Sequence, residues 1–183
     1  MQVGIYLAGA MRVTPEEEDY DRTWRTVVTQ RMEQYGSDVL IRNPMDGKIV
    51  TAGCEPKLFG QFHPEPNSVL HHDFASIVRS DIIFMNLIPL TDKTVEYQLN
   101  VTTPVGNEVH KGTMAGGYPH IGTLSELGIS YANRKLLVVV ADNPYVIRHP
   151  FVRSASTRIL PTLDDGIDYL EGLVAVLLGS QAK

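Results

Sequence analysis

The sequence predicts an α/β protein whose parallel sheet has about five strands and carries helices on both faces. Short, nearly continuous apolar runs alternate along the chain with longer segments of helical periodicity. Runs of this kind are typical of strands that helices cover on each side. The chain has 183 residues, a length at which one domain buries a sizeable core. We therefore expect a single domain over residues 1–183.

The first three predicted elements are a strand, a helix and a second strand. Val3–Ala8 is a short apolar run that a glycine ends. Pro15 and the three glutamates after it begin a helix, because the first turn favours proline and acidic residues. Asp38–Ile41 is the second strand. The apolar residues of the helix recur at helical spacing: Trp24, Val27, Val28 and Met32.

The middle of the chain contains two long segments outside this strand–helix pattern. Residues 45–66 are rich in glycine and proline and predict a long loop, which in a compact domain is often functional. A helix over Val69–Arg79 then leads into a third strand, Asp81–Asn86. Segment 88–120 has alternating apolar residues and a Pro-Val-Gly-Asn turn, so we interpret it as an inserted hairpin or flap. Its role stays open between a lid on the site and a surface excursion or oligomer contact.

The last third of the chain predicts two helices and two strands. Gly122–Gly128 begins a helix that leads into the apolar strand Leu136–Val140. Thr157–Leu160 is a short fifth strand, and Leu163–Leu178 is the last helix. The apolar face of that helix comprises Ile167, Leu170, Leu173, Val174 and Leu177.

Composition limits the setting and the partners. A net charge of −5, without a cluster of Lys and Arg, argues against a nucleic-acid polymer as partner. The single Cys54 forms no internal disulfide, which suits a reducing cytoplasm. The N-terminus lacks the basic start and long apolar run of a signal peptide. No apolar run approaches the roughly 20 residues that cross a bilayer. We expect a soluble, cytoplasmic protein with no membrane partner.

The histidines do not predict a metal site. His71 and His72 precede Asp73, but adjacent helical residues point to different faces and do not easily share one ion. His63 lies in the predicted long loop, either near the pocket or exposed. We expect no metal and no cofactor.

Glu126 has two interpretations on local grounds. A carboxylate in the first turn of a helix lies in the positive field of the N-terminus, which lowers its pKa and keeps it ionised. An ionised carboxylate can act as a covalent nucleophile toward a sugar carbon. Alternatively, Thr123-x-x-Glu126 fits a capping box, in which the glutamate only satisfies backbone donors.

Polar residues that follow parallel strands favour the nucleophile. In folds of this class, ligands bind beyond the carboxyl ends of the strands. Tyr6, Asn43, Asn86 and the turn at Glu126 are all expected at that edge.

Several segments stand in a fixed order along the chain. They are Ile5-Tyr6-Leu7-Ala8-Gly9, Asn43-Pro44, Asp73-Phe74-Ala75-Ser76-Ile77-Val78-Arg79-Ser80-Asp81 with the strand after it, and Gly122-Thr123-Leu124-Ser125-Glu126-Leu127-Gly128. Together they resemble the nucleoside 2-deoxyribosyltransferase family, which includes related deoxynucleoside 5′-monophosphate N-hydrolases. The resemblance covers most of the chain except 88–120, and it implies a flavodoxin-like fold.

The resemblance implies that Glu126 is the nucleophile. It would attack C1′ of a deoxynucleoside, expel the base and hold the deoxyribosyl group as an ester until a second base, or water, takes it. Tyr6 matches the family tyrosine that hydrogen-bonds and positions the nucleophile; its alternative role is that of a packed core aromatic. Asp73 matches the aspartate that contacts the base and helps move a proton to the leaving nitrogen. We expect Asp81 to position the start of the third strand instead.

One position departs from the family. His120 stands six residues before Glu126, where the family typically carries an aspartate. A histidine can donate to a base or leaving group near neutral pH; alternatively, base recognition differs or hydrolysis replaces transfer. Asp92, in the insertion, is a candidate substitute for the aspartate.

Further residues match positions that bind substrate. The segment from His149 to Ser156 corresponds to a region that in the family reaches the neighbouring subunit's site, which implies a homo-oligomer. Arg and hydroxyl donors suit a phosphate; Arg12, Arg153, Ser154 and Ser156 are candidates for that contact, with a solvated surface as the alternative. The substrate-binding candidates are Gly9, Arg12, Asn43, Pro44, His120, Gly122, Thr123, His149, Phe151 and Ser154.

Three functions stay in view. The leading one is exchange of bases between deoxynucleosides, and the second is hydrolysis of deoxynucleoside 5′-monophosphates. The third is a nucleotide-binding module without turnover, because a fold does not fix a function. In each case the partner is a small-molecule deoxynucleoside or deoxynucleotide, with a free base as second substrate for transfer.

Overall fold

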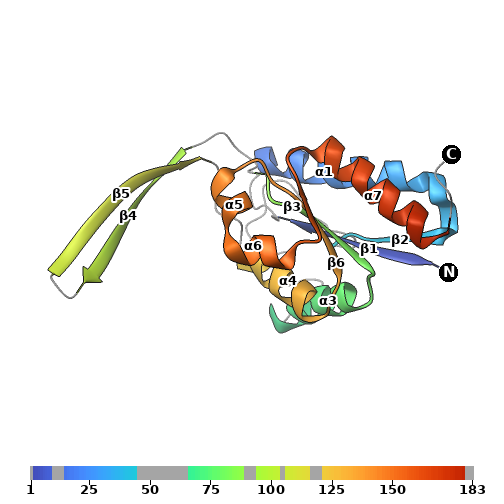
Figure 1. The fold of residues 1–183 in the computed structure, drawn as a ribbon, viewed down its shortest axis with the longest axis horizontal. Coiled ribbons are helices and arrows are strands. Elements are labelled where there is room, and N and C mark those ends of the chain that lie inside the picture. Colours follow the sequence, from blue (N-terminus) through green and yellow to red (C-terminus); the bar gives the residue numbers. More distant parts are fainter. Residues whose placement is uncertain are drawn as a thin grey trace.

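The structure, a computed structural model of the chain, describes residues 2–9, 15–44, 66–88, 94–103, 106–115 and 121–179. In 15–23, 66–70, 94–103, 106–115 and 121 it describes the backbone alone. A parallel sheet forms the centre of the molecule, and helices lie on both of its faces (Figure 1). The predicted α/β class is confirmed.

Five strands form the central sheet: β1 (Val3–Gly9), β2 (Val39–Arg42), β3 (Ile82–Asn86), β6 (Leu136–Val140) and β7 (Arg158–Leu160). Their order is β2-β1-β3-β6-β7, and every neighbouring pair is parallel. Counted along the chain, this is the order 2-1-3-4-5 of flavodoxin-like folds, whose ligands bind at the carboxyl ends beside the first and third strands. The predicted strands are confirmed, with each end within one residue.

The helices alternate with these strands. They are α1 (Pro15–Met32), followed by the 3-10 helix η1 (Glu33–Asp38), then α3 (Pro66–Val78), α4 (Ile121–Ala132), α5 (Pro144–Arg148), α6 (Pro150–Ala155) and α7 (Leu163–Leu177). The helices predicted after Pro15, over 69–79, after Gly122 and over 163–178 are confirmed. The short helix α5 was not predicted. Asn143 caps it, since its Oδ1 accepts a hydrogen bond from the Tyr145 N–H at 2.9 Å.

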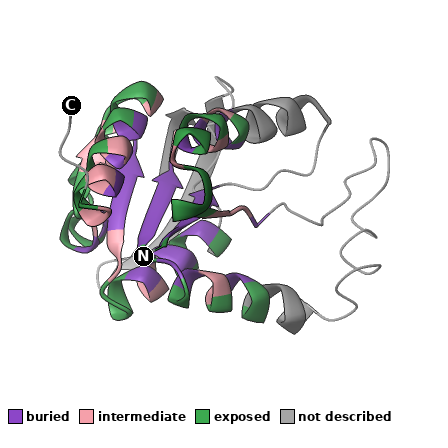
Figure 2. Cartoon of the chain, turned by 90° about the vertical axis from the view of Figure 1, so that its right-hand side faces the viewer, coloured by how far each residue is buried: buried purple, intermediate pink, exposed green. Residues whose placement is uncertain are grey.

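Alternate residues of each strand face two separate hydrophobic cores. Ile5 and Leu7 face the core under α1 and α7, whereas Tyr6 and Ala8 face the core under α3, α4 and α6. Figure 2 shows the strands buried between the helices, with the exposed positions on the outer helix surfaces. The apolar runs of the sequence are therefore explained, because both faces of each strand are covered.

Two further strands form a separate antiparallel hairpin, β4 (Thr94–Thr103) and β5 (Gly106–Ala115). Thr94 pairs with Ala115 at its base, and Thr103 pairs with Gly106 at its tip. The hairpin projects away from the central sheet (Figure 1). It lies in the segment for which the sequence predicts a hairpin or flap; its role as a lid stays a prediction.

Two other expectations concern the predicted long loop and membrane-spanning helices. The predicted loop over 45–66, with Cys54 and His63, lies outside them except for Pro66, which begins α3. Among the described helices, none is both long and apolar enough to cross a membrane.

Candidate active site

A buried hydrogen bond joins the first strand to α4. Tyr6 is the fourth residue of β1, and its ring packs on the side of the sheet that α3 and α4 cover. Its hydroxyl donates to Oε1 of Glu126 across 2.6 Å, and both side chains are buried. A distance this short is typical of a hydroxyl that donates to an ionised carboxylate. The structure thus brings together the predicted nucleophile and the tyrosine predicted to position it.

The cap interpretation of Glu126 is wrong. Helix α4 begins at Ile121, so Glu126 lies five residues after the start, in the second turn, and no acidic residue lies in the first turn. Thr123 lies inside the helix and is buried, whereas a capping box needs it at the N-cap. The expected effect of the helix N-terminus on Glu126 also loses its basis, because that effect falls off within the first turn. The Tyr6 hydroxyl donates to this carboxylate.

Asp73 supplies a second buried carboxylate beside this pair. It lies on α3 and is 7% exposed, while its neighbours His71 and His72 are exposed. Its charge acts on Tyr6, whose pKa it helps to raise. Nδ1 of His72 lies 3.4 Å from Oδ1 of Asp73, at the outer side of the carboxyl group.

Tyr6 keeps its proton at all ordinary pH values. Burial is the first cause that raises its pKa above the usual range for a phenol, and the charges of Glu126 and Asp73 raise it further. Arg25 acts in the opposite direction and does not reverse the shift. The phenol is therefore a permanent hydrogen-bond donor to Glu126.

Arg25 is a site residue that the sequence reasoning missed. It lies on α1, is 1% exposed, and stacks on the Trp24 ring at 4.4 Å from the ring centre. Its Nη2 donates to the carbonyl oxygen of Gly9 at 3.3 Å. Burial lowers its pKa to about 10, while Glu126, Tyr6 and Asp73 each act to raise it. One signal was available: Arg25 shares the i, i+3 and i+7 stripe of Val28 and Met32, which faces the core.

Not all of the residues expected at the carboxyl ends of the strands lie there. Gly9 ends β1, and Asn86 pairs with it from the end of β3. Asn86 is buried; its Oδ1 accepts from the Ile88 N–H at 3.0 Å, and its Nδ2 finds no hydrogen-bond partner among the described residues. Asn43 follows β2 and is half-buried, and Pro44 is buried. Tyr6 itself lies within the strand rather than at its end.

Three of the predicted polar residues, Arg12, Asp92 and His120, lie outside the described residues. Gly122 is exposed in the first turn of α4. Asp81 has the positioning role expected of it. Its Oδ2 accepts from the Gly4 N–H at 2.8 Å, and its own N–H donates to the Gly4 carbonyl at 2.8 Å, which ties the start of β3 to β1.

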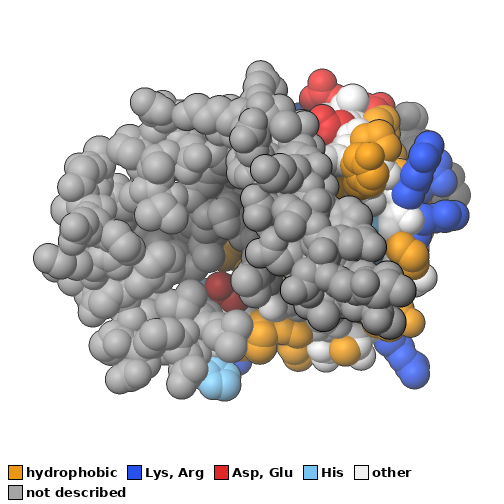
Figure 3. Space-filling model, turned by 90° about the vertical axis from the view of Figure 1, so that its left-hand side faces the viewer, with side chains coloured by type: hydrophobic (Ala, Val, Ile, Leu, Met, Phe, Trp, Pro, Cys, Tyr) orange, Lys and Arg blue, Asp and Glu red, His pale blue; other side chains and the backbone are white. Residues whose placement is uncertain are grey.

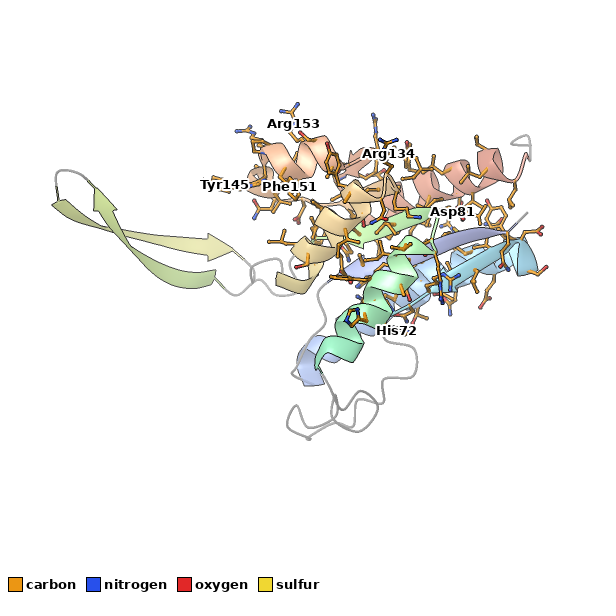
Figure 4. The ribbon with its side chains drawn as sticks, turned by 90° about the horizontal axis from the view of Figure 1, so that it is seen from below. His72, Asp81, Arg134, Tyr145, Phe151 and Arg153 are labelled. Carbon is orange, nitrogen blue, oxygen red and sulfur yellow. The ribbon has the colours of Figure 1, made fainter. Side chains whose placement is uncertain are left out.

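The segment predicted to reach a neighbouring subunit is exposed in part, whereas its Val152 and Ala155 are buried in the core. His149 stands between α5 and α6, and Phe151 packs edge-on against Tyr131 with ring centres 6.5 Å apart. Arg153 and Ser154 are exposed on α6. Figure 4 shows Tyr145, Phe151 and Arg153 together on this side of the molecule, away from His72. The phosphate contact predicted for Arg153 and Ser154 stays a prediction.

The site combines negative charge with burial. On the face at the carboxyl ends of the strands, acidic side-chain atoms are visible (Figure 3). Among the described residues, the buried acidic ones are Asp73 and Glu126. The part of the chain that the structure describes contains no group of three or more metal-ligating side chains. Two carboxylates and a fixed phenol donor can together perform nucleophilic and acid–base chemistry.

Comparison with known proteins shows the fold. No protein-family model matches the sequence, and no curated protein matches it. Among solved structures, the 2-deoxyribosyltransferase of Bacillus psychrosaccharolyticus aligns with a TM-score of 0.58 at 16% identity, over 94% of this chain and 96% of that one. A conserved protein of Enterococcus faecalis aligns at 0.59 and 11% identity, over 94% and 99% of the two chains. The 2-deoxyribosyltransferase of Leishmania mexicana aligns at 0.53 and 16% identity, over 92% and 96%. The chain thus has the fold of the deoxyribosyltransferases, in agreement with the resemblance seen in its sequence.

Proposed function

We propose that the protein cleaves the N-glycosidic bond of 2′-deoxynucleosides with Glu126 as nucleophile and transfers the deoxyribosyl group to another base. The observation that carries this proposal is the buried 2.6 Å hydrogen bond from Tyr6 to Glu126. Two structures that share the fold are described as 2-deoxyribosyltransferases, which is consistent with this chemistry. The ordered motifs of the sequence place the same two residues in these roles.

The first half-reaction breaks the bond to the base. An oxygen of the Glu126 carboxylate attacks C1′ of the sugar, and the electron pair of the glycosidic bond leaves with the base nitrogen. Asp73 helps move a proton from solvent to the departing nitrogen, because an unprotonated base anion is a poor leaving group. The product is a deoxyribosyl ester on Glu126. This route divides one difficult displacement into two easier ones.

The second half-reaction restores the enzyme. A nitrogen of an acceptor base attacks C1′, the ester bond to Glu126 breaks, and Asp73 helps move the proton of the acceptor to solvent. Tyr6 donates to one oxygen of Glu126 throughout and so orients the other toward C1′. Because this phenol keeps its proton, the carboxylate meets a donor in both halves of the cycle.

Product analysis tests the reaction. The protein is incubated with deoxynucleosides, or with their 5′-monophosphates, with and without a free acceptor base, and the products are separated by chromatography. We expect a new deoxynucleoside that forms only when the acceptor is present. Release of free base and deoxyribose 5-phosphate from the monophosphates would show that the protein is a hydrolase rather than a transferase. Binding of these compounds without any cleavage would contradict an enzymatic role.

Substitutions test the assigned residues. Glu126→Ala should lower the rate of cleavage by at least about a thousandfold, and substantial residual activity would exclude Glu126 as nucleophile. Tyr6→Phe should cost less, and Asp73→Asn should slow base departure by about a hundredfold. Glu171→Gln is the matched control, because Glu171 pairs with Arg31 on the surface and should leave the rate unchanged.

A further inference from the structure

The burial of Arg25 requires a physical explanation. Arg25 is 1% exposed, and removal of a guanidinium from water is costly unless opposite charges and hydrogen bonds compensate it. It lies on α1, the helix that contributes Trp24, Val28 and Met32 to the core, where an apolar residue would pack more cheaply. The charges and hydrogen bonds that offset this burial therefore indicate the role of the Arg25 side chain.

Its position is the carboxyl end of β1. The guanidinium lies 4.4 Å from the centre of the Trp24 ring, which fixes its plane. Nη2 donates to the Gly9 carbonyl at 3.3 Å. A Cβ at Gly9 would lie 2.9 Å from Trp24 and 3.4 Å from Nη2, so glycine leaves the room that this arrangement needs. Trp24 and Gly9 thus hold the guanidinium at the sheet edge where ligands of this fold bind.

The charges around it belong to the candidate site. Among the described residues, the titratable groups that act on Arg25 are Glu126 on α4, Tyr6 on β1 and Asp73 on α3. Both carboxylates favour the charged guanidinium and oppose the effect of its burial. Arg25 in turn counteracts their effect on Tyr6. Three elements therefore bring two carboxylates and a phenol toward one cation on a fourth.

We propose that Arg25 is a positioning residue of this site: its charge keeps Glu126 ionised opposite the Tyr6 hydroxyl, and its hydrogen bond fixes the end of β1. The effect of Arg25 on catalysis rests on the proposed function, whereas its effect on the ionisation of Glu126 does not. Without the cation, two buried carboxylates lie near each other, and like charges favour protonation of one of them. A protonated Glu126 does not attack C1′ and is a poorer acceptor for the Tyr6 hydroxyl.

The test measures the ionisation of Glu126 directly. Protein with ¹³C-labelled glutamate carboxyls is titrated by NMR, and loss of one signal in Glu126→Gln assigns the resonance. In Arg25→Met and Arg25→Gln the midpoint of the Glu126 signal should rise by about one pH unit. Arg31→Met is the matched control: Arg31 lies on the same helix but pairs with Glu171 and Asp168 on the surface, so its loss should leave the midpoint unchanged.

Kinetics supply the second readout. In Arg25→Met and Arg25→Gln, the acidic limb of the pH profile of kcat/KM should shift to higher pH together with the NMR midpoint of Glu126. Arg25→Lys keeps the charge, so its limb should stay near the wild-type position while kcat falls several-fold, because an ammonium does not reproduce the planar stacked group. If neither neutral variant folds, Arg25→Lys decides, since wild-type kcat in that variant would overturn the positioning role.

An unchanged Glu126 midpoint in folded Arg25→Met would overturn the proposal. Failure of the proposed function looks different. In that case no deoxynucleoside is cleaved by any variant, but the NMR midpoint still moves. A loss of thermal stability with both midpoint and limb unchanged would assign Arg25 to packing alone.

Discussion

Tyr6 stays protonated because its surroundings oppose the phenolate. The protein interior gives an anion little solvation, and two carboxylates lie close to it. In the unfolded chain the same phenol ionises at its usual pKa of 10.0. The folded protein therefore holds a proton above this pH that the unfolded chain has lost.

This difference predicts how stability depends on alkaline pH. A group whose pKa is raised by folding stabilises the protein fully below its unfolded pKa, and this contribution decreases as pH rises above 10. The loss is about 1.4 kcal/mol per pH unit. Arg25 has the opposite sign, because burial lowers its pKa to about 10 in the folded protein. We expect the free energy of unfolding of Tyr6→Phe to lose the pH dependence that Tyr6 causes and to keep the pH dependence that Arg25 causes.

Urea unfolding of wild type and Tyr6→Phe at about pH 9 and about pH 11 measures the difference. The free energy of unfolding should fall further in the wild type, by roughly 1.4 kcal/mol over the unit above pH 10. An equal change in the two proteins would show that Tyr6 ionises in the native state.

At the scale of elements, α7 approaches the sheet through a glycine. A Cβ on Gly166 would lie only 2.4 Å from Cγ2 of Val140 and 3.2 Å from the Phe84 ring. These neighbours are fully buried strand residues that have no room to move. The glycine therefore sets the distance between the helix and the sheet.

Gly166→Ala should accordingly destabilise the protein. Overpacking in a closed core costs about 1–3 kcal/mol, and thermal unfolding followed by circular dichroism measures the loss. Gly172 on the same helix is the control, since nothing lies within 4 Å of a Cβ placed there and the residue is exposed. Gly172→Ala should raise stability by roughly 0.5–1 kcal/mol through helix propensity. A neutral Gly166→Ala would mean that α7 shifts outward at little cost.

The strands were predictable because burial on both faces leaves an unbroken apolar run. Leu136–Val140 is identical in prediction and structure. The short helices α5 and α6 have too few residues to show helical periodicity, and only Asn143-Pro144 and Pro150 signalled their starts. The boundary of α4 was misplaced because Thr123-x-x-Glu126 imitates a cap, while the true start lies next to residues that the structure does not describe.

The site was predictable where motifs carried it and not where packing did. Tyr6, Glu126 and Asp73 came from segments with a recognisable order. Arg25 stands in a helix that resembles any amphipathic helix, and arginine is almost never buried without partners. The helical stripe that Arg25 shares with Val28 and Met32 indicates a buried position, but it does not show the groups that compensate the charge, because Gly9 and the two carboxylates lie far away along the chain.

At the scale of the whole molecule, the hairpin is attached at one place. Thr94 and Ala115 are register partners at its base, and paired residues of antiparallel strands lie about 5 Å apart. A short linker can therefore close the chain where the hairpin begins and ends. The central sheet has its five strands without it.

Replacement of residues 94–115 by a linker of about four glycines and serines should leave the sheet folded, because the two ends that it joins are close together. We expect a cooperative thermal transition near that of the wild type. If the hairpin covers the site, kcat/KM should fall at unchanged stability, and a change in oligomer mass by light scattering would indicate a contact role instead. Loss of the cooperative transition would show that the hairpin is part of the folding unit.

The bond between Tyr6 and Glu126 joins positions 120 residues apart. During synthesis, the phenol leaves the ribosome long before its acceptor exists, and β3 and the hairpin come between them. The carboxylate meets the hydroxyl where α4 packs on the sheet in which β1 pairs with β3. The contact therefore cannot form before residue 126 has been synthesised, so a nascent chain that ends earlier lacks the contact whatever it has already folded.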